Sequence, residues 1–273
     1  SSFSFTKMTT NRSSGFIANV VKLVGGNAFA QALGILVLPI LTRFFDPGAF
    51  GIAALFTSIS GVFGVIACLR YELAIMLPQD DGEAINILGL CLLSSLVVSL
   101  VIAVVVFVAG DEVVAVLHAP GLGPYLWLIP LSVFFIGVLL GLTYWNSRAR
   151  RFGRISLVQV LSSVVAQSTK LLAGIIGIVN AGGLIVAGVL GTAVSACALV
   201  RYSCFNDRRL FLRKVRIKTM LKGLWRYDKF PLFSSWSILL NTMSQQLPVW
   251  ILSVYFSASV VGYFSLSRIV LGA

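Results

Sequence analysis

Eight long blocks of apolar residues divide this chain of 273 residues and constrain its fold more than any other feature. The hydrocarbon core of a bilayer is about 30 Å thick, and a helix needs about 20 residues to cross it. The blocks lie near residues 19–42, 49–69, 84–109, 124–146, 155–178, 182–204, 230–254 and 258–273. Each block is therefore predicted to be a membrane-spanning helix.

The composition agrees with lipid as the solvent of this chain. Hydrophobic residues make up 58% of it and charged residues only 11%, whereas soluble domains contain about 25% charged residues. Backbone polar groups in lipid must be paired within the protein, so spanning segments are helices or closed barrels. Barrel strands alternate in polarity, and these blocks do not. We predict an all-α fold, a polytopic transmembrane helical bundle.

The basic residues between the blocks predict the orientation. Eighteen of the 21 Lys and Arg residues lie in segments on one side of the predicted membrane, and only Arg43 lies in a segment on the other. The positive-inside rule places the N-terminus and the basic segments in the cytoplasm. Topology thus explains the net charge of +12, and nucleic acid is not expected as a partner.

One basic segment has a helical pattern of its own. Its apolar residues follow the spacing of a one-faced helix, and its basic residues occupy another face. The apolar residues are Ile217, Met220, Leu221, Leu224 and Trp225, and the basic residues are Lys214, Lys218, Lys222 and Arg226. Such a helix lies in the headgroup plane and binds anionic lipid. A topology anchor between two halves of the protein is the simpler interpretation, and binding of a particular partner is the alternative.

A weak internal repeat predicts the organisation of the bundle. An Asn-x-x-x-Gln motif followed by Leu-Pro occurs at residues 27–39 and again at 241–248. Residues 44–55 align without gaps with residues 255–266, with three identities. A repeat after six helices predicts two six-helix lobes related by a pseudo-twofold axis. This chain would hold the first lobe and two helices of the second, as an incomplete copy of a twelve-helix protein.

Three parts are therefore expected along the chain. Residues 1–204 would form the N-terminal transmembrane lobe of six helices, and residues 205–229 a basic cytoplasmic linker. Residues 230–273 would begin the C-terminal lobe. Within the first lobe, Gly137-x-x-x-Gly141 predicts a face on which two helices pack closely. Pro39 and Pro248 are predicted to kink the first and seventh spans at matching places.

Lys170 is the most informative single residue. It lies midway through the block 155–178, where a charged side chain costs at least about 2.5–3.5 kcal/mol unless it faces protein or water. Gln159, Ser163 and Gln167 share one helical face with it. This polar face favours a water-filled central cavity. The alternatives are that the amine reaches out to the membrane surface, or that this face packs against another helix.

Arg268 is a second cation within a predicted span, and Ser265 lies on the same side. It would line the same cavity, because a guanidinium binds phosphate through two parallel hydrogen bonds; an arginine that reaches out of the membrane is the alternative. No carboxylate lies in the middle of a predicted span, which favours an anionic passenger. Amides for a hydroxyl-rich substrate, or for helix–helix hydrogen bonds, would come from Asn27, Gln31, Asn241, Gln245 and Gln246.

Catalytic constellations are missing from the sequence. His118, the one histidine, has no nucleophile motif near it. Asp80 and Asp81 raise the alternative of a metal-dependent glycosyl transfer site. However, Asp80-x-x-Glu83 at the start of a predicted helix is typical of an N-terminal cap. We expect no enzyme, no metal and no cofactor.

Four stretches carry the most recognisable motifs. They are Leu38-Pro-Ile-Leu-Thr-Arg-Phe-Phe-Asp-Pro-Gly-Ala-Phe-Gly51, Arg70-Tyr-Glu-Leu-Ala-Ile-Met-Leu-Pro78, Phe230-Pro-Leu-Phe233 and Gln246-Leu-Pro-Val249. In these stretches the chain resembles the polysaccharide transporter (O-antigen/oligosaccharide flippase) family of the multidrug/oligosaccharidyl-lipid/polysaccharide exporter superfamily. The Arg-Tyr-Glu-Leu-Ala run is the most specific of them.

The resemblance implies a flippase of the bacterial inner membrane. It would move an undecaprenyl-diphosphate-linked oligosaccharide, such as an O-antigen or exopolysaccharide repeat unit, by alternating access, with polysaccharide assembly proteins as further partners. Lys170 and Arg268 would neutralise the diphosphate. The other residues of the cavity would be Gln167, Asn27, Gln31, Asn241 and Gln245.

Three other functions remain open at this point. A cation-coupled multidrug exporter of the same superfamily usually needs an intramembrane acid, and these spans have none. A membrane polysaccharide ligase or polymerase would need a large outer loop, and the outer loops are short. A scaffold subunit without transport activity would not need the polar face around Lys170.

Overall fold

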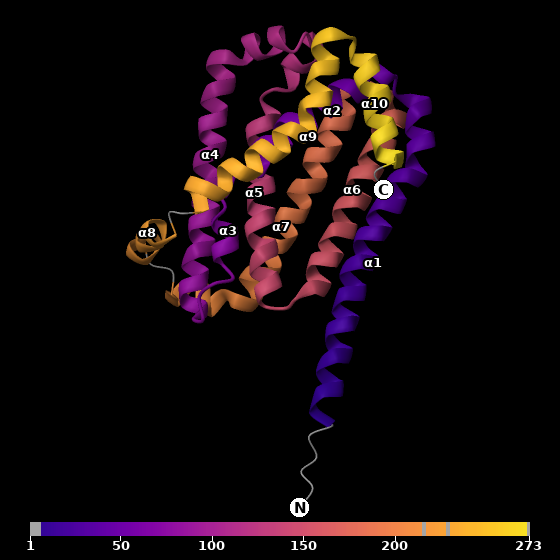
Figure 1. The fold of residues 1–273 in the computed structure, drawn as a ribbon. Coiled ribbons are helices and arrows are strands. Elements are labelled where there is room, and N and C mark those ends of the chain that lie inside the picture. Colours follow the sequence, from indigo (N-terminus) through magenta and orange to yellow (C-terminus); the bar gives the residue numbers. More distant parts are fainter. Residues whose placement is uncertain (1–6, 215–216, 228–229, 272–273) are drawn as a thin grey trace, which may run out of the picture.

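The computed structural model describes residues 7–214, 217–227 and 230–271, and every regular element in these residues is a helix. The predicted all-α fold is therefore confirmed. Long helices run side by side, and α1 extends beyond the bundle towards the N-terminus (Figure 1). The elements are α1 (Lys7–Phe44), α2 (Pro47–Gly64), α3 (Tyr71–Ala74), α4 (Asp81–Val116), η1 (Pro120–Tyr125), α5 (Leu128–Arg148), α6 (Phe152–Ile176), α7 (Ala181–Lys214), α8 (Ile217–Arg226), η2 (Phe230–Ser234), α9 (Ser235–Tyr255) and α10 (Ala258–Leu271).

Among the residues that the structure describes, six helical segments are long and apolar enough to cross a membrane. They are Val24–Phe44, Pro47–Gly64, Asp81–Val116, Leu128–Arg148, Phe152–Ile176 and Ala181–Phe205. They correspond to the first six predicted spans. The chain is thus a multi-pass membrane protein.

The last two predicted spans are helices in the structure, but they are less apolar or shorter than the other six. The α9 helix has 21 residues but is not among the six apolar segments, because Asn241, Gln245 and Gln246 lower its hydropathy. The α10 helix is described over 14 residues, which at about 1.5 Å per residue is shorter than a bilayer core. Gly272 and Ala273 lie outside the described residues. Within the described residues, the first six predicted spans are thus confirmed as helices long and apolar enough to cross a membrane, and the last two stay predictions.

The turn between α1 and α2 is fixed by local signals. Asp46 caps α2 by accepting a hydrogen bond from the N–H of Ala49 at 3.3 Å. Pro47 takes the first helical position, where a missing N–H has no cost. Phe45 is buried in the same turn, with its ring edge-on to that of Phe50 at a centroid distance of 6.3 Å. The start of α2 is therefore held in one place.

The predicted close-packing face on α5 is confirmed. A Cβ added at Gly137 would collide with the side chain of Ser95 on α4, and one added at Gly141 would lie 3.4 Å from Cys91. The thiol of Cys68 donates to the carbonyl oxygen of Gly137 at 3.2 Å. The absence of side chains at the two glycines therefore lets α5 approach α4 closely.

Apolar side chains divide between the core and the outer surface of the bundle. One buried cluster joins α2, η1, α5 and α7 and includes Phe45, Leu55, Leu122, Ile129 and Leu184. A second joins α3, α4, α5 and α7 and includes Ile75, Ile85, Leu88, Trp145 and Leu199. Other large apolar side chains face outward, such as Phe107 and Ile175, which are 75% and 70% exposed. Acyl chains would cover this outer surface in a membrane.

Ion pairs join the helices on the side of the bundle where α5 meets α6 and α7 leads to α8, which we call the basic face. Arg148 donates to Asp81 at 3.0 Å, and Arg226 donates to Glu83 at 2.8 Å. The hydroxyl of Tyr227 donates to the same Glu83 oxygen at 3.2 Å. Burial and the Glu83 carboxylate raise the pKa of Tyr227, so this hydroxyl remains a donor at neutral pH.

The acidic turn before α4 does not cap the helix as predicted. Asp80 occupies the N-cap position, but its side chain makes no capping hydrogen bond. The neighbouring acids Asp81 and Glu83 instead bind Arg148 and Arg226. Hydrogen bonds between charged groups are about twice as strong as neutral ones, which favours this arrangement.

The helix predicted in the linker is present as α8. It lies beside the ends of α3 and α4 (Figure 1). Tyr71 donates to the carbonyl oxygen of Leu224 at 3.4 Å, and the end of the Met220 side chain packs at Gly89 of α4. Trp225 is 79% exposed. The side chains of Lys214, Lys218 and Lys222, which were predicted to form its basic face, lie outside the described residues.

Candidate functional site

A cavity of about 590 Å³ lies among α1, α2, α6, α7, α9 and α10. Its size is typical of ligand pockets, which range over about 300–1,000 Å³. Apolar residues supply most of its wall. The polar residues that line it are Thr57, Ser58, Gln167, Lys170, Gln246, Ser265 and Arg268.

The two predicted cations line this one cavity. Lys170 comes from the C-terminal third of α6 and is partly buried, while Arg268 comes from α10 and is exposed. No Asp or Glu is found among the described residues that line the cavity. Because nothing acidic offsets the two cations there, the cavity favours an anion.

The polar face of α6 has two uses along its length. Towards the basic face, the amide of Gln159 donates to Asn27 of α1 at 2.9 Å, and the hydroxyl of Ser163 donates to the carbonyl oxygen of Ala30 at 3.0 Å. Further along, Gln167 and Lys170 line the cavity. Both interpretations of this face therefore apply, a helix interface at one end and a cavity wall at the other.

The remaining amides of the predicted site do not line the cavity. They are Asn27, Gln31, Asn241 and Gln245, and all four are exposed. The cavity amide of α9 is Gln246, which the sequence offered as a candidate amide but which was not assigned to the predicted site. One helical residue turns a side chain by about 100°, so adjacent glutamines cannot share a face. Gln246 and Val249 share one face of α9, and both line the cavity; the register relative to Val249 would have selected Gln246.

Equivalent positions of the internal repeat line the same cavity. The pairs Ala54 and Ser265, Thr57 and Arg268, and Ser58 and Ile269 are each separated by 211 residues, and all six residues line it. The first member of each pair is on α2 and the second on α10. The ungapped repeat alignment, extended past residue 55, pairs Thr57 with Arg268, but Thr57 was not assigned to the predicted site. The repeat alignment was the signal that would have found it.

Two polar atoms on the cavity wall lack an internal partner. The hydroxyl oxygen of Ser58 and the amide oxygen of Gln167 are buried without a hydrogen-bond partner among the described residues. Buried polar groups in proteins are almost always paired with protein, water or ligand. Water or a polar ligand in the cavity would satisfy both atoms.

Comparison with known proteins adds a family relationship. Residues 40–272 match a family described as polysaccharide biosynthesis protein. The matched segment contains most of the bundle and both cavity cations. Neither a curated protein nor a solved structure gives a significant match to the chain.

Proposed function

Because the chain belongs to the polysaccharide biosynthesis protein family, we propose that it is a flippase for undecaprenyl-diphosphate-linked oligosaccharide in the bacterial inner membrane. The passenger would be an O-antigen or exopolysaccharide repeat unit, moved from the cytoplasmic to the outer leaflet. The observation that carries the proposal is the cavity in which Lys170 and Arg268 occur without an acid.

The proposed mechanism assigns different tasks to different walls. Lys170 and Arg268 neutralise the diphosphate, whose hydration must be replaced as it leaves the membrane surface. Gln167, Gln246 and Ser58 offer amides and a hydroxyl to sugar hydroxyls. The polyprenyl chain stays in lipid, beside the apolar outer surface. Alternating access to the cavity from the two membrane faces then moves the headgroup across.

The orientation and partners are part of the same proposal. The basic face lies in the cytoplasm by the positive-inside rule, together with the N-terminus. Anionic lipid binds the basic linker, residues 205–229, and polysaccharide assembly proteins receive the product. In this proposal the protein is a transporter and not an enzyme.

Substitution of Lys170 tests the proposal in a polysaccharide-producing bacterium. Loss of one charge-assisted hydrogen bond removes about 1.5–3 kcal/mol, so Lys170→Ala is expected to lower export of surface polysaccharide about 10- to 150-fold. Lys170→Arg, which keeps the positive charge, should retain more export than Lys170→Ala. Arg43→Ala, which removes a cation outside the cavity, should leave it unchanged. Membrane abundance must be equal in all variants.

The rival functions give different results in the same strains. Normal surface polysaccharide in the double variant Lys170→Ala/Arg268→Ala would refute the flippase proposal. A polymerase would leave single repeat units at the surface when it is inactivated, whereas a flippase leaves none. A multidrug exporter would change drug sensitivity and not polysaccharide.

A further inference from the structure

A second pocket lies at the basic face, away from the central cavity. It has a volume of about 440 Å³ and is formed by the turn between α5 and α6 together with Tyr202 of α7. Arg150, Arg151 and Arg154 line it, and Leu157 adds an apolar side chain. It shares no lining residue with the central cavity.

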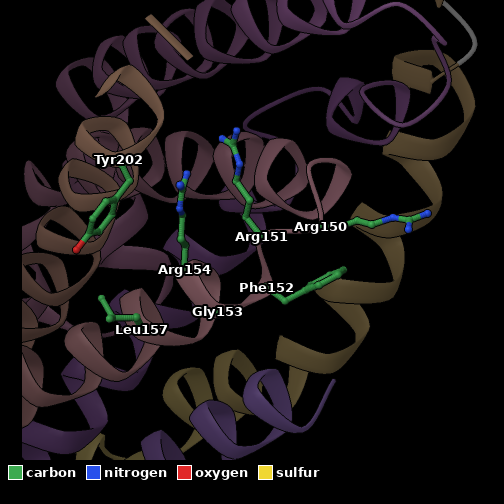
Figure 2. A pocket seen from close by; sticks show the side chains of 7 residues that line it. All are labelled: Arg150, Arg151, Phe152, Gly153, Arg154, Leu157 and Tyr202. Atoms are coloured by element: carbon green, nitrogen blue, oxygen red, sulfur yellow. The ribbon is translucent and has the colours of Figure 1, made fainter. Parts of the chain in front are cut away.

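Two of the three arginines of this pocket extend in the same direction. Figure 2 shows Arg151 and Arg154 extending in parallel from the start of α6, while Arg150 points away from them. The Nη1 atom of Arg154 is buried and has no hydrogen-bond partner among the described residues. A buried donor of this kind destabilises the fold, and more so when it is charged, unless a ligand or water accepts a hydrogen bond from it.

The local backbone adds positive potential to the same place. The pocket lies at the N-terminus of α6, a helix of 25 residues with no acidic residue in its first turn. Arg151 is the N-cap residue, and its side chain makes no capping hydrogen bond. A helix N-terminus carries about half a positive charge and favours anions. Cations placed there repel the helix dipole, so an anion would stabilise the arrangement.

The pocket also lies at a defined depth in the membrane. One apolar span ends at Arg148 and the next begins at Phe152, so the turn between them lies in the headgroup layer. The positive-inside rule explains why arginines occur in such a turn. It does not explain why they line a hollow or why one guanidinium nitrogen is buried without an acceptor.

We propose that this pocket binds the anionic phosphate headgroup of a membrane lipid. Arg151 and Arg154 would hold the phosphate, while Leu157 and the ring of Tyr202 would contact the first carbons of the lipid. An anionic phospholipid and a polyprenyl diphosphate share this chemistry. The site does not depend on the proposed transport function, because it requires only a lipid phosphate in the adjacent leaflet.

Hydrogen–deuterium exchange of the purified protein in nonionic detergent tests the site locally. The probes are dioctanoyl phosphatidylglycerol and farnesyl diphosphate as the two lipid sources, with inorganic diphosphate and zwitterionic dioctanoyl phosphatidylcholine for comparison. We expect an anionic lipid to slow exchange in residues 149–157. The lipid that protects at the lower concentration identifies the source.

Variants separate a built site from general surface charge. Arg154→Gln is expected to raise the lipid concentration needed for half-maximal protection at least tenfold, and Arg154→Lys to raise it less. Arg201→Gln removes the same charge at a residue that is adjacent to Tyr202 in the sequence but does not line the pocket. It should change the lipid concentration for half-maximal protection less than twofold. All variants must elute as the wild type does on gel filtration.

Four results would overturn the proposal. These are no protection by either anionic lipid, equal protection by phosphatidylcholine, equal protection by inorganic diphosphate, and equal weakening by Arg201→Gln and Arg154→Gln. The third would identify a site for soluble phosphate, and the fourth a diffuse electrostatic attraction.

Discussion

Gly51 of α2 and Gly262 of α10 make equivalent contacts, because each glycine lies against the backbone of the first residue of the other helix. A Cβ at Gly51 would collide with the carbonyl oxygen of Ala258, the first residue of α10, and a Cβ at Gly262 would collide with that of Pro47, the first residue of α2. Each pair of equivalent positions is 211 residues apart. The two helices are thus related by local twofold symmetry where they begin.

Substitution of Gly51 tests whether this contact holds the two helices together. Gly51→Ala places a methyl group where the backbone of α10 lies, and the two helices must separate to admit it. Overpacking of this kind costs about 1–3 kcal/mol. We expect a lower midpoint of thermal unfolding in detergent, and a similar loss for Gly262→Ala.

Gly61 provides the matched control on the same helix. A Cβ at Gly61 would have no neighbour within 4 Å, so Gly61→Ala should stabilise α2 by about 0.5–1 kcal/mol through its higher helix propensity. Equal effects of Gly51→Ala and Gly61→Ala would show that propensity, and not the contact with α10, determines the result.

The sequence predicted more of the fold than of the site. Blocks of about 20 apolar residues predict spans because the bilayer fixes their length, and the repeat aligned Gly51 with Gly262. Alignment alone does not say that aligned residues touch. Nor does it give the rotation of each helix, which left Gln245 in the predicted site in place of Gln246. Rotation depends on packing against neighbouring helices, which a local pattern does not contain.

The two glutamines of α9 allow a test of the cavity with a built-in control. Gln246 lines the cavity, whereas Gln245 is exposed and does not. A neutral hydrogen bond contributes about 0.5–1.5 kcal/mol. Gln246→Ala is therefore expected to slow polysaccharide export about 2- to 10-fold, and Gln245→Ala to leave the rate unchanged. A larger loss for Gln245→Ala would place the passenger elsewhere.

The ion pair between Arg226 and Glu83 is expected to position α8 more than to stabilise the protein. Arg226 is 68% exposed, and exposed pairs contribute about 0–1 kcal/mol. Arg226→Gln should therefore change the unfolding midpoint little but speed tryptic cleavage around α8. Arg201→Gln, whose guanidinium lies over the ring of Phe205, is the control. Unchanged cleavage in Arg226→Gln would show that other contacts fix α8.

The Arg-Tyr-Glu-Leu-Ala motif has a structural explanation at the basic face. Leu69 and Arg70 have positive φ angles of 49° and 63°, a conformation that non-glycine residues adopt only when their surroundings impose it. The reversal lets Arg70 donate to Glu72 at 3.1 Å and to Ser234 of η2 at 3.3 Å. The motif thus connects α3 to the element that precedes α9, which its sequence alone did not reveal.

Glu72 makes the stability of this connection depend on pH. Its side chain is fully buried and one carboxylate oxygen has no partner among the described residues. Burial raises the pKa of Glu72, although the Arg70 guanidinium lowers it in part. Because the pKa of Glu72 is raised in the folded state, the protein is more stable at low pH, below the pKa of Glu72 in the unfolded chain. This extra stability is lost as the pH rises through the pKa of the folded state.

The variant Glu72→Gln tests this pH dependence, because an amide cannot ionise. The unfolding midpoint of the variant, minus that of the wild type, should therefore increase from pH 5 to pH 8. Each kcal/mol corresponds to about 2–4 °C. A constant difference between the two proteins over this range would contradict a raised pKa.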